Sequence, residues 1–199
     1  MQPNNEISMT GVPNTSSSQI QPTKLTIRES ALKVDESIFY YLTHVYMENL
    51  FRDGKKDLNE KIYELEKIGE TLGKNINERV TVDLLEKFMK DKEKQNIKNL
   101  EYIKFICKEF WIYLFGKPID SLQTNHKGTF FLTDTNFKYL SRLSSGKSDE
   151  NKAYISFTLN FVKSLIKGAL HAFSRSSEVT VDNTKDAEYL FVIRVKEED

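Results

Sequence analysis

The chain has few of the residues from which disulfides, zinc sites and membrane spans are built. Cys107 is its single cysteine, so no internal disulfide can form, as is usual for proteins in a reducing compartment. Lys+Arg and Asp+Glu both number 29, so the surplus of positive charge typical of nucleic-acid binders is missing. No apolar run approaches the roughly 20 residues of a membrane span, and the N-terminus does not read as a signal peptide. We therefore expect a soluble, cytosolic protein.

The first part of the chain lacks aromatic residues, the first of which is Phe39. Three of the four prolines lie there, among many Ser, Thr, Asn and Gln residues. Such a segment cannot bury enough apolar surface to offset the entropy lost on ordering it. We predict that residues 1–33 form a disordered tail and that residues 34–199 form one folded domain.

The sequence offers little for metal binding or nucleophilic catalysis. His44, His126 and His171 are not spaced as a pair of metal ligands, and no second cysteine is available, so a zinc site is not expected. A turn histidine such as His126 can act as an acid or base, but a structural role is the commoner one. Cys107 lies mid-helix on an apolar stripe, and we interpret it as a buried packing residue.

A possible phosphate-binding loop fails on its spacing. Gly146-Lys147-Ser148 resembles the end of such a loop, but the pattern needs a glycine at position 141, which is Ser141. No local motif suggests a Ser-His-Asp arrangement. We therefore predict no catalytic, cofactor-binding or metal-ligating residues, and no enzyme activity.

Two amphipathic helices are predicted at the start of the folded part. The first begins near Asp35 and ends at Arg52, with apolar residues at spacings of three and four. The second begins at Asp57, which with Glu60 has the spacing of a capping box. Its apolar stripe contains Leu58, Ile62, Leu65, Gly69, Leu72, Ile76 and Val80.

The rest of the chain predicts a helix, a hairpin, another helix and a second hairpin. Residues 100–115 are apolar around most of the helix, and Gly116 supplies its C-terminal cap. Strands are predicted at 129–133 and 137–143, and again at 178–181 and 188–196, on either side of a helix at about 153–173. This order predicts an α+β fold, with helices packed on one side of a twisted antiparallel four-stranded sheet.

Gly69 and Gly73 lie one turn apart inside the second predicted helix. Each costs about 1 kcal/mol relative to alanine in a helix interior, which indicates that another backbone approaches closely. That backbone could belong to the same domain or to a partner helix, and the spacing alone does not distinguish the two.

Two stretches resemble signatures of a known family. They are Phe105-Ile-Cys-Lys-Glu-Phe-Trp111 and Ile119-Asp-Ser-Leu-Gln-Thr-Asn-His-Lys-Gly128. In both, the chain is similar to the small subunits of the transport protein particle (TRAPP), in the subunit-six branch. The resemblance runs from about Asp35 to Lys196.

The resemblance implies a non-catalytic scaffold subunit of a vesicle-tethering complex that activates a Rab GTPase in ER-to-Golgi and Golgi transport. It implies a heterodimer with another small TRAPP subunit, the acylated Bet-three-type subunit, and peripheral association with Golgi and ER–Golgi membranes through the complex. The predicted partner interface lies on the first two helices and comprises Ile38, Phe39, Leu42, Tyr46, Leu65, Gly69, Leu72 and Gly73.

The resemblance also bears on lipid attachment. In the partner branch a cysteine carries an acyl chain inside the core, and the matching position here lies near Asn96, which cannot be S-acylated. No lipid attachment and no cofactor are therefore predicted. An alternative to the scaffold role is a ligand-binding module. The expected fold also resembles that of bacterial four-vinyl-reductase domains and haem-based gas sensors. On that alternative, a cavity between the helices at 100–115 and 153–173 would bind a small molecule or an acyl chain.

Overall fold

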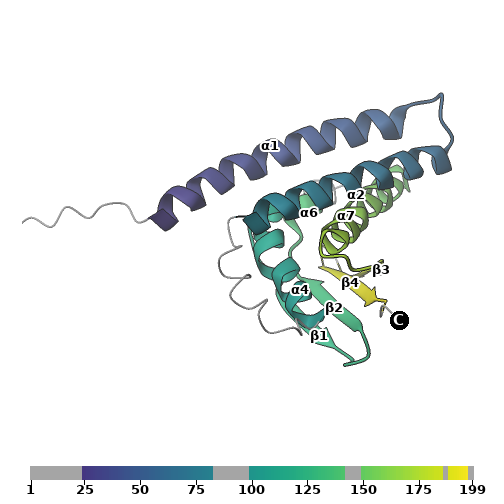
Figure 1. The fold of residues 1–199 in the computed structure, drawn as a ribbon. Coiled ribbons are helices and arrows are strands. Elements are labelled where there is room, and N and C mark those ends of the chain that lie inside the picture. Colours follow the sequence, from purple (N-terminus) through teal and green to yellow (C-terminus); the bar gives the residue numbers. More distant parts are fainter. Residues whose placement is uncertain (1–23, 83–98, 142–148, 186–187, 197–199) are drawn as a thin grey trace, which may run out of the picture.

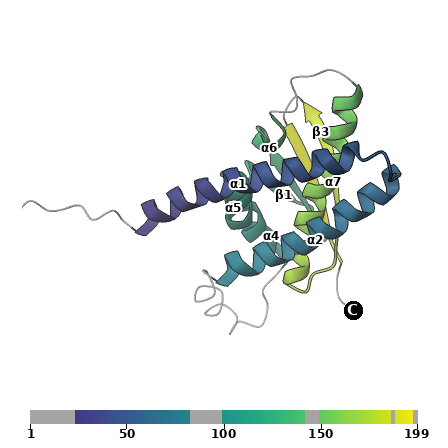
Figure 2. The same ribbon diagram turned by 90° about the horizontal axis from the view of Figure 1, so that it is seen from above.

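The computed structural model describes residues 24–82, 99–141, 149–185 and 188–196. They form three layers (Figures 1 and 2): a sheet, then a middle layer of helices, then two long helices outermost. The outer helices are α1 (Lys24–Arg52) and α2 (Leu58–Val82). The middle layer contains α4 (Asn99–Phe105), η1 (Ile106–Phe110), α5 (Trp111–Phe115), α6 (Lys138–Ser141) and α7 (Asp149–Ala172).

The sheet has four antiparallel strands in the order β1-β2-β4-β3. Their bounds are β1 (Ser121–Thr124), β2 (Thr129–Asp134), β3 (Ser177–Lys185) and β4 (Glu188–Val195). The helices lie on one side of the sheet, which confirms the predicted α+β class.

Helix α1 begins about three turns before the predicted start at Asp35. The helix therefore includes residues 24–33, which we predicted to precede the folded domain. These residues follow the last N-terminal proline and contain several strong helix formers, among them Leu25, Arg28, Ala31 and Leu32. The prediction for residues 1–23 lies outside the described residues.

Helix α2 starts where its capping box predicts. The backbone N–H of Glu60 donates to Oδ1 of Asp57 at 2.8 Å, and the backbone N–H of Asp57 donates to Oε2 of Glu60 at 3.2 Å. Two N–H groups that would otherwise lack partners at the helix start are thereby satisfied. Residues 83–98, including the polar run that follows α2, lie outside the described residues.

The predicted helix at 100–115 is interrupted by one π-helical turn, η1. There the backbone N–H of Trp111 donates to the carbonyl of Ile106, five residues back, as well as to that of Lys108. The carbonyl of Cys107 accepts instead from the backbone N–H of Ile119 at 2.8 Å, which ties the helix to the segment leading into β1. Gly116 ends α5 in the left-handed conformation with φ 73°, as predicted.

The first hairpin was predicted with the wrong partner strand, because β2 pairs with the segment before it and not with the segment after it. β2 pairs with β1, through a turn in which His126 (φ 60°) and Gly128 (φ 78°) adopt positive φ values. Residues 138–141, predicted to be a strand, form α6 instead. Phe137, Tyr139 and Leu140 are all buried, and a strand would turn consecutive side chains to opposite faces. The second hairpin pairs as predicted, as β3 with β4.

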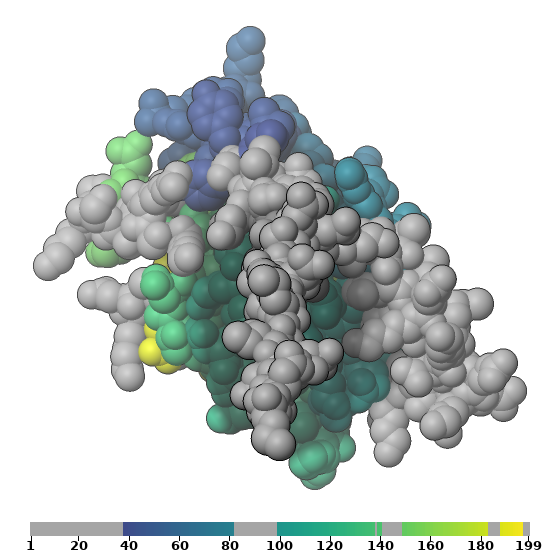
Figure 3. Space-filling model, turned by 90° about the vertical axis from the view of Figure 1, so that its left-hand side faces the viewer, coloured from purple at the N-terminus to yellow at the C-terminus, as the bar shows by residue number. Residues whose placement is uncertain are grey.

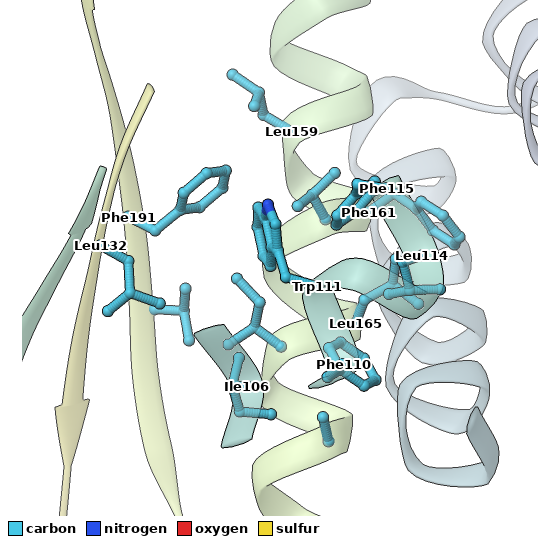
Figure 4. Packing of buried hydrophobic residues seen from close by; sticks show 14 of the residues in the cluster. Ile106, Phe110, Trp111, Leu114, Phe115, Leu132, Leu159, Phe161, Leu165 and Phe191 are labelled. Carbon is cyan, nitrogen blue, oxygen red and sulfur yellow. The ribbon is translucent and has the colours of Figure 1, made fainter. Parts of the chain in front are cut away.

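The core lies between the sheet and the middle helices (Figure 4). Trp111 of α5 is fully buried and points toward Phe191 of β4, with their ring centroids 5.2 Å apart. The ring of Phe137 stacks on Trp111 at 5.7 Å and meets the ring of Phe115 edge to face at 5.0 Å. The first signature stretch therefore supplies the centre of the core.

A buried carboxylate joins this core to the sheet. Asp134, at the end of β2, is 0% exposed. Its Oδ2 accepts from Nε1–H of Trp111 at 2.9 Å, and its Oδ1 pairs with Nζ of Lys117 at 2.6 Å. Lys117 also binds Asp120 at 2.8 Å, and chiefly that hydrogen bond lowers the pKa of Asp120 to about 2. Lys117 thus balances the charge of two carboxylates.

Helices α2 and α7 pack at very short range. A Cβ added at Gly73 would overlap the carbonyl oxygen of Leu165, and one added at Gly168 would overlap the carbonyl oxygen of Glu70. A Cβ at Gly69 would lie 2.7 Å from Cβ of Ser164. The close approach predicted for Gly69 and Gly73 is therefore to a helix of the same chain.

Candidate partner interface

The inner face of α1 is anchored to the middle layer by aromatic and polar contacts. Oγ1 of Thr43 lies 2.7 Å from the hydroxyl of Tyr139, and Nε2 of His44 donates to the carbonyl of Tyr139 at 3.2 Å. Met47 is fully buried, and Phe39 packs against the core from a half-buried position. These contacts fix which face of α1 is turned outward.

The outer face of α1 carries a stripe of exposed large apolar side chains, which we call the α1 stripe. It consists of Ile38, Tyr41, Leu42 and Val45, which are 52%, 67%, 61% and 41% exposed. Their spacing of three, four and seven residues puts them on one side of the helix. In Figure 3 the described part of α1, in purple and blue, stands at the outer edge of the molecule. A continuous apolar stripe of this kind is typical of a protein-binding surface.

Helix α2 adds fewer exposed apolar groups. Leu58, Tyr63 and Ile68 are 57%, 69% and 37% exposed.

A carboxylate of α2 binds both α1 and the turn before α2. Tyr46 of α1 donates its hydroxyl hydrogen to Oε1 of Glu64 at 2.9 Å, and burial together with this bond raises the pKa of Tyr46 to about 12. Lys56 forms an ion pair with the same carboxylate. Glu64 therefore joins α1, α2 and the turn between them.

The predicted interface residues divide into three groups. Ile38 and Leu42 lie on the α1 stripe, whereas Phe39, Tyr46 and Leu72 are half-buried and pack against the chain's own core. The interface assignment of three further residues needs correction: Leu65 is fully buried, and Gly69 and Gly73 lie against α7. The apolar stripe of α2 was assigned to a partner because a sequence pattern shows that a face is covered but not what covers it. Tyr41 and Tyr63, which the prediction missed, are exposed aromatic residues on the same two helices.

The described residues give no support for metal chemistry or for a membrane span. Within the described ranges, no three His, Cys, Asp or Glu side chains are grouped so that they could hold a metal ion. None of the helices in those ranges is long and apolar enough to cross a bilayer. The loop residues Gly146 to Ser148 lie outside the described residues.

The comparisons with known proteins agree with this fold. Residues 36–196 match the family described as transport protein particle (TRAPP) component. The chain belongs to the TRAPP family. It is 33% identical over 153 residues to the trafficking protein particle complex subunit 6B of Homo sapiens, covering 74% of this chain and 89% of that protein. The subunit 6A of Homo sapiens is 39% identical over 83 residues, or 41% of this chain and 50% of that protein. These relatives place this TRAPP subunit in the subunit-six branch.

A solved TRAPP structure shares the fold at low sequence identity. It is a trafficking protein particle complex subunit 3 from Naegleria fowleri, covalently bound to palmitic acid, with a TM-score of 0.58 and 13% identity. The match covers 83% of this chain and 97% of that one. At this identity the likeness establishes the fold alone.

The single cysteine of this TRAPP subunit is buried in η1, with 8% of its surface exposed. Burial raises the pKa of the Cys107 thiol to about 12, from an ordinary 9.0, so the thiolate fraction at pH 8 falls about a thousandfold. We predict that Cys107 in the native protein resists iodoacetamide at pH 8 and reacts fully in concentrated urea. Mass spectrometry of the alkylated chain measures both. Rapid labelling of the native protein would contradict the buried position.

The space proposed for a ligand under the alternative is occupied at one end by aromatic rings. Tyr102 and Phe105 of α4 lie 4.8 and 5.4 Å from the ring centroid of Phe173, just after α7. Ile103, Ile106 and Leu170 are fully buried in the same cluster. The helices around 100–115 and 153–173 thus meet in a packed contact there.

Proposed function

We propose that this chain is a non-catalytic scaffold subunit of the TRAPP complex, and that it binds another small TRAPP subunit through the outer face of α1. The observation that carries the proposal is the α1 stripe, Ile38, Tyr41, Leu42 and Val45, in a chain whose relatives are named as subunits of this complex. Exposed apolar surface is costly in water, and covering it contributes roughly 25 cal/mol per Å². The stripe therefore favours a stable partner.

Within the complex, the subunit would hold one end of the assembly that tethers vesicles and activates a Rab GTPase in ER-to-Golgi and Golgi transport. We propose the Bet-three-type subunit as the partner, and peripheral association with Golgi and ER–Golgi membranes through the complex. The partner, by this proposal, carries the lipid, since the position here that matches its acylated cysteine lies near Asn96, which cannot be S-acylated. Co-purification of the tagged full chain from cytosol, followed by mass spectrometry, tests whether the chain is a subunit of the TRAPP complex. We expect to recover other small TRAPP subunits.

Substitution of Leu42 by aspartate should abolish this pairing while leaving the fold intact. Leu42 is 61% exposed, so its loss does not open the core. Burying a leucine contributes about 1.5–3 kcal/mol, and burying an unpaired carboxylate adds a further penalty, so affinity should fall at least about a hundredfold. The dissociation constant of the complex, measured by calorimetry, checks this.

Leu58→Asp is the matched control, because Leu58 is 57% exposed and receives the same substitution on another helix. We expect it to change affinity less than about threefold, as is usual outside an interface hot spot. Equal losses in the two variants would contradict the placement of the interface on α1, and unchanged affinity in Leu42→Asp would do the same.

A further inference from the structure

A cavity of about 330 Å³ opens between α1 and the N-terminal turns of α7. We call it the α1–α7 pocket. Its size is at the lower end for a ligand pocket and suits one side chain better than a lipid. The residues that line it are Tyr40, His44, Glu48, Phe51, Arg52, Glu150, Asn151 and Tyr154.

The aromatic residues of the pocket form a row of rings across both helices. The rings of Tyr40 and His44 lie 4.2 Å apart, and those of Phe51 and Tyr154 meet edge to face at 5.2 Å. Nε2 of His44 donates to a backbone carbonyl, and its Nδ1 lies 3.4 Å from the hydroxyl of Tyr154. The faces of such rings carry negative electrostatic potential and attract cations.

The charged residues of the pocket leave one negative charge in excess. Arg52 is paired with Glu48 at 2.9 Å. Glu150 has no ion-pair partner among the described residues. Burial raises the pKa of Tyr154 to about 12, and the charge of Glu48 adds to the rise, so its hydroxyl stays protonated at neutral pH. An anion is disfavoured here, because Asp149 and Glu150 already place two negative charges on the first turn of α7.

The pocket is next to the α1 stripe. Tyr41 and Val45 of the stripe alternate along α1 with Tyr40 and His44 of the pocket. On a helix, positions 40, 44, 48 and 51 line the side adjacent to positions 38, 41, 42 and 45. A polypeptide bound on the stripe can therefore reach into the pocket with one side chain.

We propose that the α1–α7 pocket receives an arginine or lysine side chain of the small TRAPP subunit that covers the α1 stripe, an inference that rests on the proposed pairing. The aromatic rings and the carboxylate of Glu150, for which the described part of the chain supplies no ion-pair partner, together match a cationic group. The pocket then supplies specificity for one partner, while the stripe supplies most of the buried apolar area.

Glu150→Lys tests this with Asp149→Lys as its control. Both variants reverse a charge in the first turn of α7, so they change net charge and helix-dipole interactions alike. Glu150 lines the pocket from an exposed position, whereas Asp149 is not among the residues that line it. The side chain of Asp149 is 98% exposed and pairs with Lys152. We expect Glu150→Lys to raise the dissociation constant of the complex at least about tenfold at low salt. Asp149→Lys should raise it less than about threefold. The gap should narrow as salt rises.

A double-mutant cycle then identifies the occupant. Each arginine and lysine on the partner is replaced by alanine and measured against both wild-type and Glu150→Gln chains. We expect one basic residue whose loss costs clearly less in the Glu150→Gln background than in the wild type. Equal thermal unfolding midpoints of the variants exclude misfolding as the cause.

The possible results separate this inference from the proposed function. If the wild-type chain recovers no TRAPP subunit, the pairing and the pocket assignment both fail. If the complex forms and Leu42→Asp disrupts it, but Glu150→Lys behaves like Asp149→Lys or binds more tightly, only the pocket assignment is overturned. The same holds if no basic residue of the partner is coupled to Glu150.

Discussion

Gly73→Ala is expected to destabilise the folded chain by about 2–4 kcal/mol, although alanine favours a helix by about 1 kcal/mol over glycine. The two effects predict opposite signs, and the packing decides between them. A Cβ at Gly73 would overlap the carbonyl oxygen of Leu165 and lie 2.8 Å from its carbonyl carbon. Backbone atoms of a buried helix cannot rotate away as a side chain can, so α2 and α7 would have to separate.

Thermal and urea unfolding measure this effect. For a chain of about 200 residues, 2–4 kcal/mol corresponds to a fall of roughly 5–15 °C in the unfolding midpoint. Gly54→Ala is the matched control, because no atom lies within 4 Å of a Cβ at Gly54. We expect that control to change stability by less than about 0.5 kcal/mol. A Gly73→Ala variant as stable as the wild type would show that the two helices are not packed so closely.

The second large effect is expected at Asp134, where alanine should cost about 3–5 kcal/mol. Removing the carboxylate leaves the indole N–H of Trp111 buried without its acceptor at 2.9 Å. It also removes one of the two carboxylates that pair with Lys117, whose side chain is 19% exposed. Burial alone would lower the pKa of Lys117, but hydrogen bonds to Asp120 and Asp134 outweigh it and raise that pKa. Total stabilities of domains are about 5–15 kcal/mol, so this loss is a large part of the whole.

A cycle with Trp111→Phe locates the cost. In the Trp111→Phe background no indole donor is left unpaired, so Asp134→Ala should cost clearly less than it does in the wild type. Asp182→Ala, at an exposed position on β3, is the control and should change stability by less than about 0.5 kcal/mol. Urea midpoints of the four chains give the coupling. A loss below about 1 kcal/mol for Asp134→Ala would contradict the role of this carboxylate in the core.

The accuracy of the sequence-based prediction depended on how local each signal is. The start of α2 was predicted correctly because the capping box involves only Asp57 and Glu60. The end of α5 was predicted correctly because a single glycine, Gly116, easily adopts the positive φ that ends a helix. The segment at 138–141 was predicted wrongly because aromatic residues favour strands in general, whereas here three neighbouring side chains fit into the core as a helical turn. β1 was missed because Leu122 is its only apolar residue.

The prediction of the candidate interface likewise succeeded only where it depended on a local pattern. The sequence identified an apolar face on each of the first two helices, and Ile38 and Leu42 of α1 are indeed exposed. It could not distinguish a face covered by the chain's own helix from one left uncovered. Leu65, Gly69 and Gly73 have the pattern of an interface and lie inside the molecule. The α1–α7 pocket had no sequence signal, because Glu48 and Glu150 are about a hundred positions apart in the chain.

By itself, the sequence determined the helical periods, the caps, the membership of an α+β class and the resemblance to TRAPP small subunits. Each of these depends on residues close together in the chain or on a short motif. Only the tertiary structure decided that α7 covers the glycine face of α2, that Asp134 reaches Trp111, and that the outer face of α1 is left exposed. Burial is a property of which elements meet, and contacts between distant segments form only when the whole chain is packed.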